Sequence, residues 1–96
     1  MSEYNVAVQD NSKKEMFEGW AGDNTIAQLV EAAQAEGVGA GIAGSDMGIQ
    51  IENGTSSDKA VHEFSAIAED TLSDHCNADG TILILQGDTK VGSPRS

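Results

Sequence analysis

Residues 71–86, with the sequence TLSDHCNADGTILILQ, decide how this chain folds. The segment joins a polar turn to four consecutive large aliphatic residues at 82–85. An unbroken run of this kind is typical of a central strand that is covered on at least one face. In the turn, we expect Leu72 to fill the open end of the core while Ser73 and Asp74 bind local backbone N–H groups, so that the chain reverses into the strand.

Two strands are expected nearer the N-terminus. Residues 4–9 alternate in polarity, with Val6 and Val8 on one face, which is typical of a half-buried strand. A turn of polar residues at 10–13 follows, and residues 14–20 then have strand character. Because the connection is so short, we expect the two strands to pair as a hairpin.

The second strand of this hairpin needs an irregularity. With regular alternation, Met16 and Trp20 share a face with Glu18, while Phe17 lies on the other face. A β-bulge near Gly19 would resolve the conflict, because one extra residue reverses the alternation.

A helix is expected to begin after Thr25. Thr25 and Gln28 have the spacing of a capping box, in which the hydroxyl binds a backbone N–H group of the first turn and the amide side chain binds back. Gly37 is expected to end the helix in a left-handed conformation. One face of the helix is apolar and should pack on a sheet; it consists of Ile26, Leu29, Val30 and Ala33.

The segment 37–48 is rich in glycine, and Gly39, Gly41 and Gly44 match the pattern G-x-G-x-x-G. A phosphate-binding loop of this pattern follows a strand and opens a helix, since the phosphate lies at the N-terminus of that helix. Here a helix precedes the glycines and a strand follows them. We therefore interpret the segment as a connection, with Ile42 under the sheet.

A third strand is expected at residues 48–52, ending at the turn residues Asn53 and Gly54. Two interpretations of residues 57–70 remain open. On a helix, one face would be apolar, with Val61, Phe64, Ala68 and Leu72. Alternatively, residues 60–64 form a short strand that pairs with the third. Of the two, the helix is the one we expect.

Composition limits both size and partners. A chain of 96 residues forms one domain that buries roughly 60–70% of its unfolded surface. Its net charge is −11, from 16 acidic against 5 basic residues. This charge repels phosphates and anionic lipids, so we expect neither a nucleic-acid nor a membrane partner. A basic protein would be attracted by the same charge, although acidity also serves simply to keep a small protein in solution.

The single cysteine, Cys76, excludes a disulfide within the chain, so nothing indicates a secreted disulfide scaffold. The first residues contain no basic or apolar targeting segment, and no window approaches the roughly 18 apolar residues of a membrane span. A cytoplasmic location is the resulting expectation.

The order strand, turn, strand, capped helix, strand, irregular segment and closing strand resembles the ubiquitin-like β-grasp family. Residues 71–75, TLSDH, resemble the TLSDY turn of ubiquitin, and Thr25 and Ile26 resemble the threonine and isoleucine that open its helix. The resemblance covers nearly the whole chain in the order of elements, with identity at a handful of positions. It implies an α+β fold: a mixed four- to five-stranded sheet with one main helix packed across it, and a second short helix if residues 57–70 are helical.

The resemblance also implies a site. The last strand would lie centrally, parallel to the first, with Ile82 and Ile84 facing the helix. Leu83 and Leu85 would then lie on the opposite face, where proteins of this family commonly bind partners through an apolar patch. Gln50 stands where the third strand would contribute an apolar residue to that patch. Alternatively, an additional segment at residues 57–70, relative to ubiquitin, folds over both leucines and buries them.

The domain is expected to span residues 1–88, followed by a flexible tail at 89–96. Modifiers and sulfur carriers of the family act through a C-terminal diglycine that threads into an activating enzyme, and this tail has none. A protease that trimmed the chain after Gly92 would leave one terminal glycine. A modifier precursor conjugated to targets is therefore the alternative function, and a sulfur carrier ranks below it.

No catalytic constellation is expected. His75 and Cys76 are adjacent in sequence, but a nucleophilic pair needs side chains that the fold brings together, and we expect Cys76 to pack at the turn. Adding His62 and Glu63 gives no regular zinc spacing, and residues 77–80 lack the first and last ligands of a calcium loop. We expect a small non-enzymatic protein, without cofactor or metal, that binds another protein.

Overall fold

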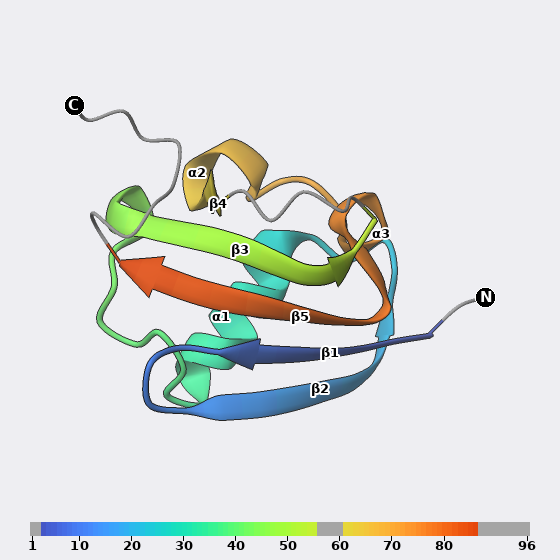
Figure 1. Ribbon diagram of the computed structural model, residues 1–96, viewed down its shortest axis with the longest axis horizontal. Helices are drawn as coiled ribbons and strands as arrows, with labels where there is room; N and C mark the ends of the chain where they lie inside the picture. Colours follow the sequence, from blue (N-terminus) through green and yellow to red (C-terminus); the bar gives the residue numbers. More distant parts are fainter. Residues whose placement is uncertain (1–2, 56–60, 87–96) are drawn as a thin grey trace.

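The computed structural model describes residues 3–55 and 61–86. Its sheet has five strands (Figure 1), namely β1 Glu3–Gln9, β2 Lys14–Ala21, β3 Met47–Gly54, β4 Val61–Glu63 and β5 Cys76–Gln86. The helical elements are α1 Ile26–Ala35, the 3-10 turn η1 Gly44–Asp46, α2 Phe64–Ile67 and α3 Leu72–His75.

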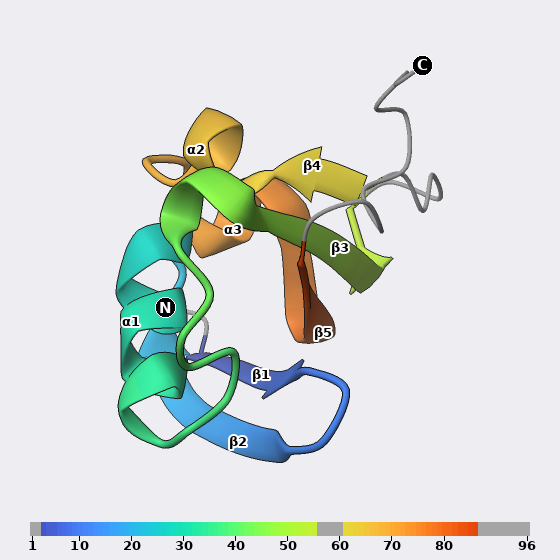
Figure 2. The ribbon, with the colours of Figure 1, turned by 90° about the vertical axis from the view of Figure 1, so that its left-hand side faces the viewer.

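The strands are ordered β2-β1-β5-β3-β4, so that β5 is central. It runs parallel to β1 and antiparallel to β3, and the outer pairs β1–β2 and β3–β4 are both antiparallel. Helix α1 crosses one side of the sheet (Figure 2). This is the β-grasp-like α+β topology that was predicted, and the isoleucine and leucine run occupies the predicted central strand.

The predicted bulge in β2 is confirmed. Tyr4 pairs with Trp20 and Val6 pairs with Phe17, so two residues of β2 lie opposite Asn5 alone. The backbone N–H of Gly19 donates to Oδ1 of Asn5 at 3.0 Å. As a result Phe17 and Trp20 both pack against the core, with their rings edge to face and the centroids 6.0 Å apart.

Both predicted ends of α1 are also confirmed. Thr25 and Gln28 form the capping box, with distances of 3.1 Å and 2.9 Å for the two reciprocal hydrogen bonds. Gly37 has a φ angle of 98°. The N–H groups of Gly37 and Val38 donate to the carbonyls of Gln34 and Ala33, which is the Schellman arrangement.

The core lies between α1 and the sheet. The four residues predicted for the apolar face of α1 are all buried. Opposite them lie buried side chains of the three central strands, namely Val6, Val8, Met47, Ile49, Ile51, Ile82 and Ile84. Val38 is also buried, and Ile42 packs against the same cluster, as expected for the glycine-rich connection.

The helix expected within residues 57–70 is wrong for its first part. Val61–Glu63 form strand β4, antiparallel to β3, and among the described residues of this segment only Phe64–Ile67 are helical. The alternative of a short strand is therefore the correct one for β4, whereas residues 56–60 lie outside the described part. The edge of β3 offers unpaired backbone groups, and pairing with them outweighs a helical pattern in so short a segment.

The turn before β5 is one helical turn, α3, and it is joined by backbone hydrogen bonds to the segment that leads into α1. The N–H of Leu72 donates to the carbonyl of Asn24 at 2.8 Å, and that of Ser73 donates to Gly22 at 3.0 Å. Leu72 has no exposed surface and closes the end of the core, as predicted. The turn therefore fixes where α1 begins.

Asp10 connects the hairpin turn to the glycine-rich connection. Its Oδ1 accepts from the backbone N–H groups of Ser12 and Lys13, each at 2.8 Å, and its Oδ2 accepts from the N–H of Gly39 at 2.7 Å. These bonds, that from Gly39 foremost, lower the pKa of Asp10, because they favour the charged carboxylate.

We expect Asp10→Ala to lower stability at neutral pH and to do so less in acid. A carboxyl group whose pKa is lower in the folded state stabilises the fold above its unfolded pKa of about 4, and this contribution disappears as the pH falls through the folded-state pKa. Thermal melting of wild type and variant from neutral pH down to about pH 2 would measure the difference. Asn11→Ala, in the same turn, serves as the control without a titrating group. A difference for Asp10→Ala that stays constant into acid would contradict the assignment.

In the part of the chain that the structure describes, no helix combines the length and the apolar character needed to span a bilayer.

Candidate functional site

The structure brings the three residues of the predicted binding patch together on one face of the sheet. Gln50 pairs directly with Leu83. Two residues further along the same strands, Leu85 pairs with Gly48. Their neighbours Ile82 and Ile84 are buried in the core beneath α1. Because side chains alternate along a strand, Gln50, Leu83 and Leu85 lie on the side away from α1, which we call the outer face. All three are partly exposed.

Val61 and Met16 are further apolar residues of the outer face, although neither was assigned to it from the sequence. Val61 of β4 pairs with Gln50, and it is 9% exposed. Met16 of β2 pairs with Ala7, which pairs in turn with Thr81 of β5. Met16 is 51% exposed, more than any other large apolar side chain of the described residues. The irregular alternation of β2 could have indicated this position of Met16. Once a bulge allows Phe17 and Trp20 both to face the core, Met16, which is adjacent to Phe17, must lie on the opposite face.

Charged residues surround this apolar group unevenly. Glu52 pairs with Thr81 of β5, and Glu63 of the edge strand β4 pairs with Gly48 of β3, which places both carboxylates on the outer face. On the other side, Lys14 pairs with Gln9. The outer face is therefore apolar along β5 and acidic toward β3 and β4.

The described part of the additional segment does not extend over the two leucines. Its strand β4 continues the sheet beside β3. The following residues turn to the side of α1, since Ile67 lies in the core and the carbonyl of Ala68 accepts the N–H of Ala27 at 2.9 Å. Residues 57–60 of the same segment lie outside the described part of the chain.

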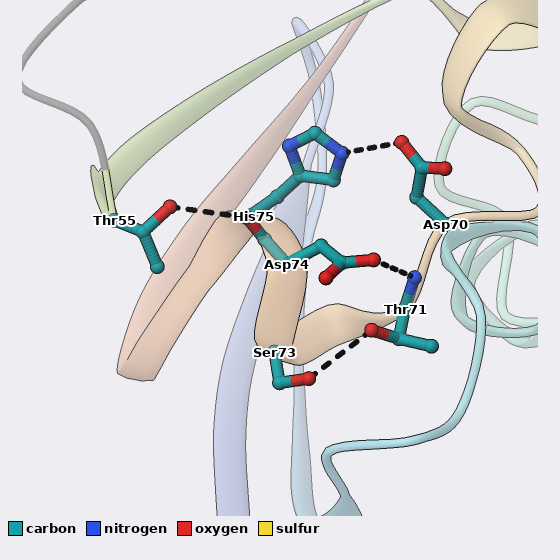
Figure 3. A network of polar contacts seen from close by, with 6 residues as sticks. All are labelled: Thr55, Asp70, Thr71, Ser73, Asp74 and His75. Carbon is teal, nitrogen blue, oxygen red and sulfur yellow. Dashed lines mark hydrogen bonds and ion pairs between the residues drawn. The ribbon is translucent and has the colours of Figure 1, made fainter.

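A polar network holds the turn that precedes β5 (Figure 3). The backbone N–H of Thr71 donates to Oδ2 of Asp74 at 3.1 Å, and the hydroxyl groups of Thr71 and Ser73 are 3.1 Å apart. The bond from Thr71 lowers the pKa of Asp74. Thr55, at the end of β3, donates from its hydroxyl to the carbonyl of Asp74 at 3.1 Å. Asp74 thus binds a local N–H group as predicted, whereas Ser73 binds a hydroxyl group instead.

His75 and Cys76 do not form a nucleophilic pair. The imidazole Nε2 of His75 lies 2.8 Å from Oδ2 of Asp70, and its ring centroid lies 5.6 Å from that of His62. Cys76 is 1% exposed within the core, and burial raises its pKa to about 11. The thiol therefore stays protonated at neutral pH, and Cys76 is a packing residue, as predicted.

Two further predictions from the sequence concern the absence of a metal site and the C-terminal tail. Within residues 3–55 and 61–86, no three histidine, cysteine or carboxylate side chains are grouped so that they could bind one metal ion. The proposed trimming site, Gly92, and the boundary between domain and tail at residues 88 and 89 lie outside the described residues.

No protein-family model matches this chain, and no curated protein matches it in sequence.

Proposed function

We propose that this chain is a ubiquitin-like protein that acts by binding another protein, without catalysis, through the outer face of its sheet. The observation that carries the proposal is the register of β3 and β5, which sets Gln50 against Leu83 and adds Leu85 beside them, on the face away from α1. Two partly exposed leucines in a central strand supply an apolar contact, and the neighbouring glutamine can fix its orientation through hydrogen bonds.

The partner has basic side chains around an apolar contact. The net charge of −11 attracts such a protein over a distance. Glu52 and Glu63 lie on the same face as the leucines, so they would meet the basic side chains at the rim of the contact. Charges at the rim chiefly raise the association rate and select the partner, while the apolar centre supplies most of the affinity.

The experiment uses variants of the outer face that differ in the part of the contact they change. Proteins captured from source-cell lysate by the wild-type chain are purified and titrated against it one at a time. We expect Leu83→Ser with Leu85→Ser to weaken binding at least about tenfold, with an unchanged circular dichroism spectrum. We expect Glu52→Lys with Glu63→Lys to slow association and to reduce its dependence on salt.

Ala35→Ser is the control, because Ala35 is an exposed residue of α1 on the other side of the sheet. Full binding by the double serine variant would contradict the proposal. So would an intact-mass measurement in lysate that finds the chain cleaved after Gly92 or joined to other proteins through Gly92, since that outcome identifies a modifier handled by a protease and an activating enzyme.

A further inference from the structure

Asn53 occupies an unusual backbone position at the end of β3. Among the described residues it is the only one other than glycine with a positive φ angle, at 56°. The register between β3 and β5 shifts between Glu52 and Gly54 and pairs Asn53 with no residue of β5. The side chain is exposed. Asn53 is therefore held in a conformation that few residue types adopt readily, outside the regular strand pairing.

The residue that follows is glycine for a structural reason. A Cβ atom on Gly54 would overlap the backbone carbonyl oxygen of His75 and lie 2.6 Å from Cγ2 of Ile51. The fold therefore requires glycine at position 54, directly after the exposed Asn53. Since Gly54 has no side chain, no Cβ atom at residue 54 obstructs attack of its backbone nitrogen on the side-chain carbonyl of Asn53.

We propose that Asn53 is a site of spontaneous deamidation. The backbone nitrogen of Gly54 loses its proton and attacks Cγ of Asn53, so that an N–C bond forms and a five-membered succinimide ring closes. The Cγ–Nδ2 bond breaks, and Nδ2 leaves as ammonia with the added proton. Water then adds to either carbonyl carbon of the ring and breaks one C–N bond, which gives aspartate or isoaspartate. Water is the only co-reactant, and nothing is oxidised or reduced.

Deamidation of Asn53 would change the contacts between β3 and β5. Nδ2 of Asn53 donates to Oδ1 of Asp79 at 2.6 Å, which joins the end of β3 to the start of β5. After deamidation the donor is gone, and two carboxylates face each other at the same place, where like charges repel. Isoaspartate would also lengthen the backbone between residues 53 and 54, shortly before Thr55, whose N–H donates to the carbonyl of His75 at 3.1 Å. The modification therefore loosens the join between β3 and the turn that precedes β5.

The other asparagines of the chain serve as internal references for the deamidation rate of Asn53. They are each followed by a residue with a side chain, and they are Asn5, Asn11, Asn24 and Asn77. Asn77 is the closest match, because it is exposed at the same end of the sheet and its Nδ2 donates to the carbonyl of Gly54 at 3.0 Å.

The first test follows the modification itself. The folded full-length chain is incubated in mildly alkaline buffer and sampled over time by peptide mapping that separates aspartate from isoaspartate. We expect residue 53 to convert first, to both products, while Asn77 remains intact. Asn53→Gly keeps a residue that tolerates positive φ and should accumulate no acidic form. The proposal is overturned if Asn53 in the folded chain is as stable as Asn77, or converts only after the chain is unfolded in denaturant.

The second test concerns the consequence. Asn53→Asp reproduces one product and is expected to lower the melting temperature by several degrees. The same substitution in an Asp79→Asn background should lower it much less, because the opposing carboxylate is absent. Equal losses in the two backgrounds would overturn the repulsion between residues 53 and 79 and, with it, the loosening of this end of the sheet.

Discussion

Leu72→Ala is expected to cost the fold about 2–5 kcal/mol, the range for removing a fully buried leucine side chain. Leu72 has no exposed surface, and it packs in the core with side chains of α1 and the sheet. Its backbone N–H holds Asn24 at the start of α1, so little relaxation can fill the cavity. Urea denaturation followed by the fluorescence of Trp20, the single tryptophan, would measure the loss.

Leu83→Ala is the matched control, because it removes the same atoms from a partly exposed position on the outer face. We expect it to cost about 1 kcal/mol, since less apolar surface is returned to water. Equal losses at the two positions would contradict the outward orientation of Leu83. In that case the leucines of β5 would be core residues, and the proposed binding face would be lost.

Gly39→Ala is expected to cost about 2–4 kcal/mol, from backbone strain together with crowding. Gly39 has a φ angle of 67°, and a Cβ atom there would lie 2.9 Å from Cδ1 of Ile84 in the central strand. Its N–H is also the donor that reaches Asp10 from the connection. Moving the backbone to relieve the contact would therefore weaken that bond, and thermal melting would show the combined loss.

Gly41→Ala separates the two causes. Gly41 has a φ angle of 88° but no atom within 4 Å of the position of a Cβ, so only the backbone strain of about 1–2 kcal/mol applies. The excess at Gly39 should shrink when Ile84→Val removes the Cδ1 atom, which makes the two substitutions non-additive. Equal costs for Gly39→Ala and Gly41→Ala would show that contact with Ile84 contributes nothing.

The features predicted correctly from sequence are those with a local cause. The conflict between Phe17 and Trp20 required a bulge, and the bulge lies at Gly19. The spacing of Thr25 and Gln28 marked the start of α1. The resemblance to the β-grasp family placed β5 at the centre, and burial of its alternate residues followed from strand geometry.

The features that were missed depend on contacts between distant parts of the chain. Val61 is in a strand because β3 offers it backbone partners. This strand was the alternative interpretation of the sequence, but the spacing of the apolar residues around Val61 favoured a helix. The bond from Gly39 to Asp10 joins residues 29 positions apart. Met16 belongs to the outer face through its pairing with Ala7. For the candidate site, sequence reading therefore found the residues on the central strands and missed those contributed from β2 and β4.

The parallel pairing of β1 and β5 also governs when the molecule can fold. Strand β5 is the last described element, yet it lies between β1 and β3 (Figure 1). A nascent chain that lacks it has a hairpin and a helix but no sheet to join β1 to β3, and its apolar surfaces stay open to solvent or to chaperones. Closing such distant contacts is slow because the loop entropy must be lost first. Folding during synthesis is therefore delayed until β5 has left the ribosome, and truncation before Ile82 removes the whole fold rather than one edge of it.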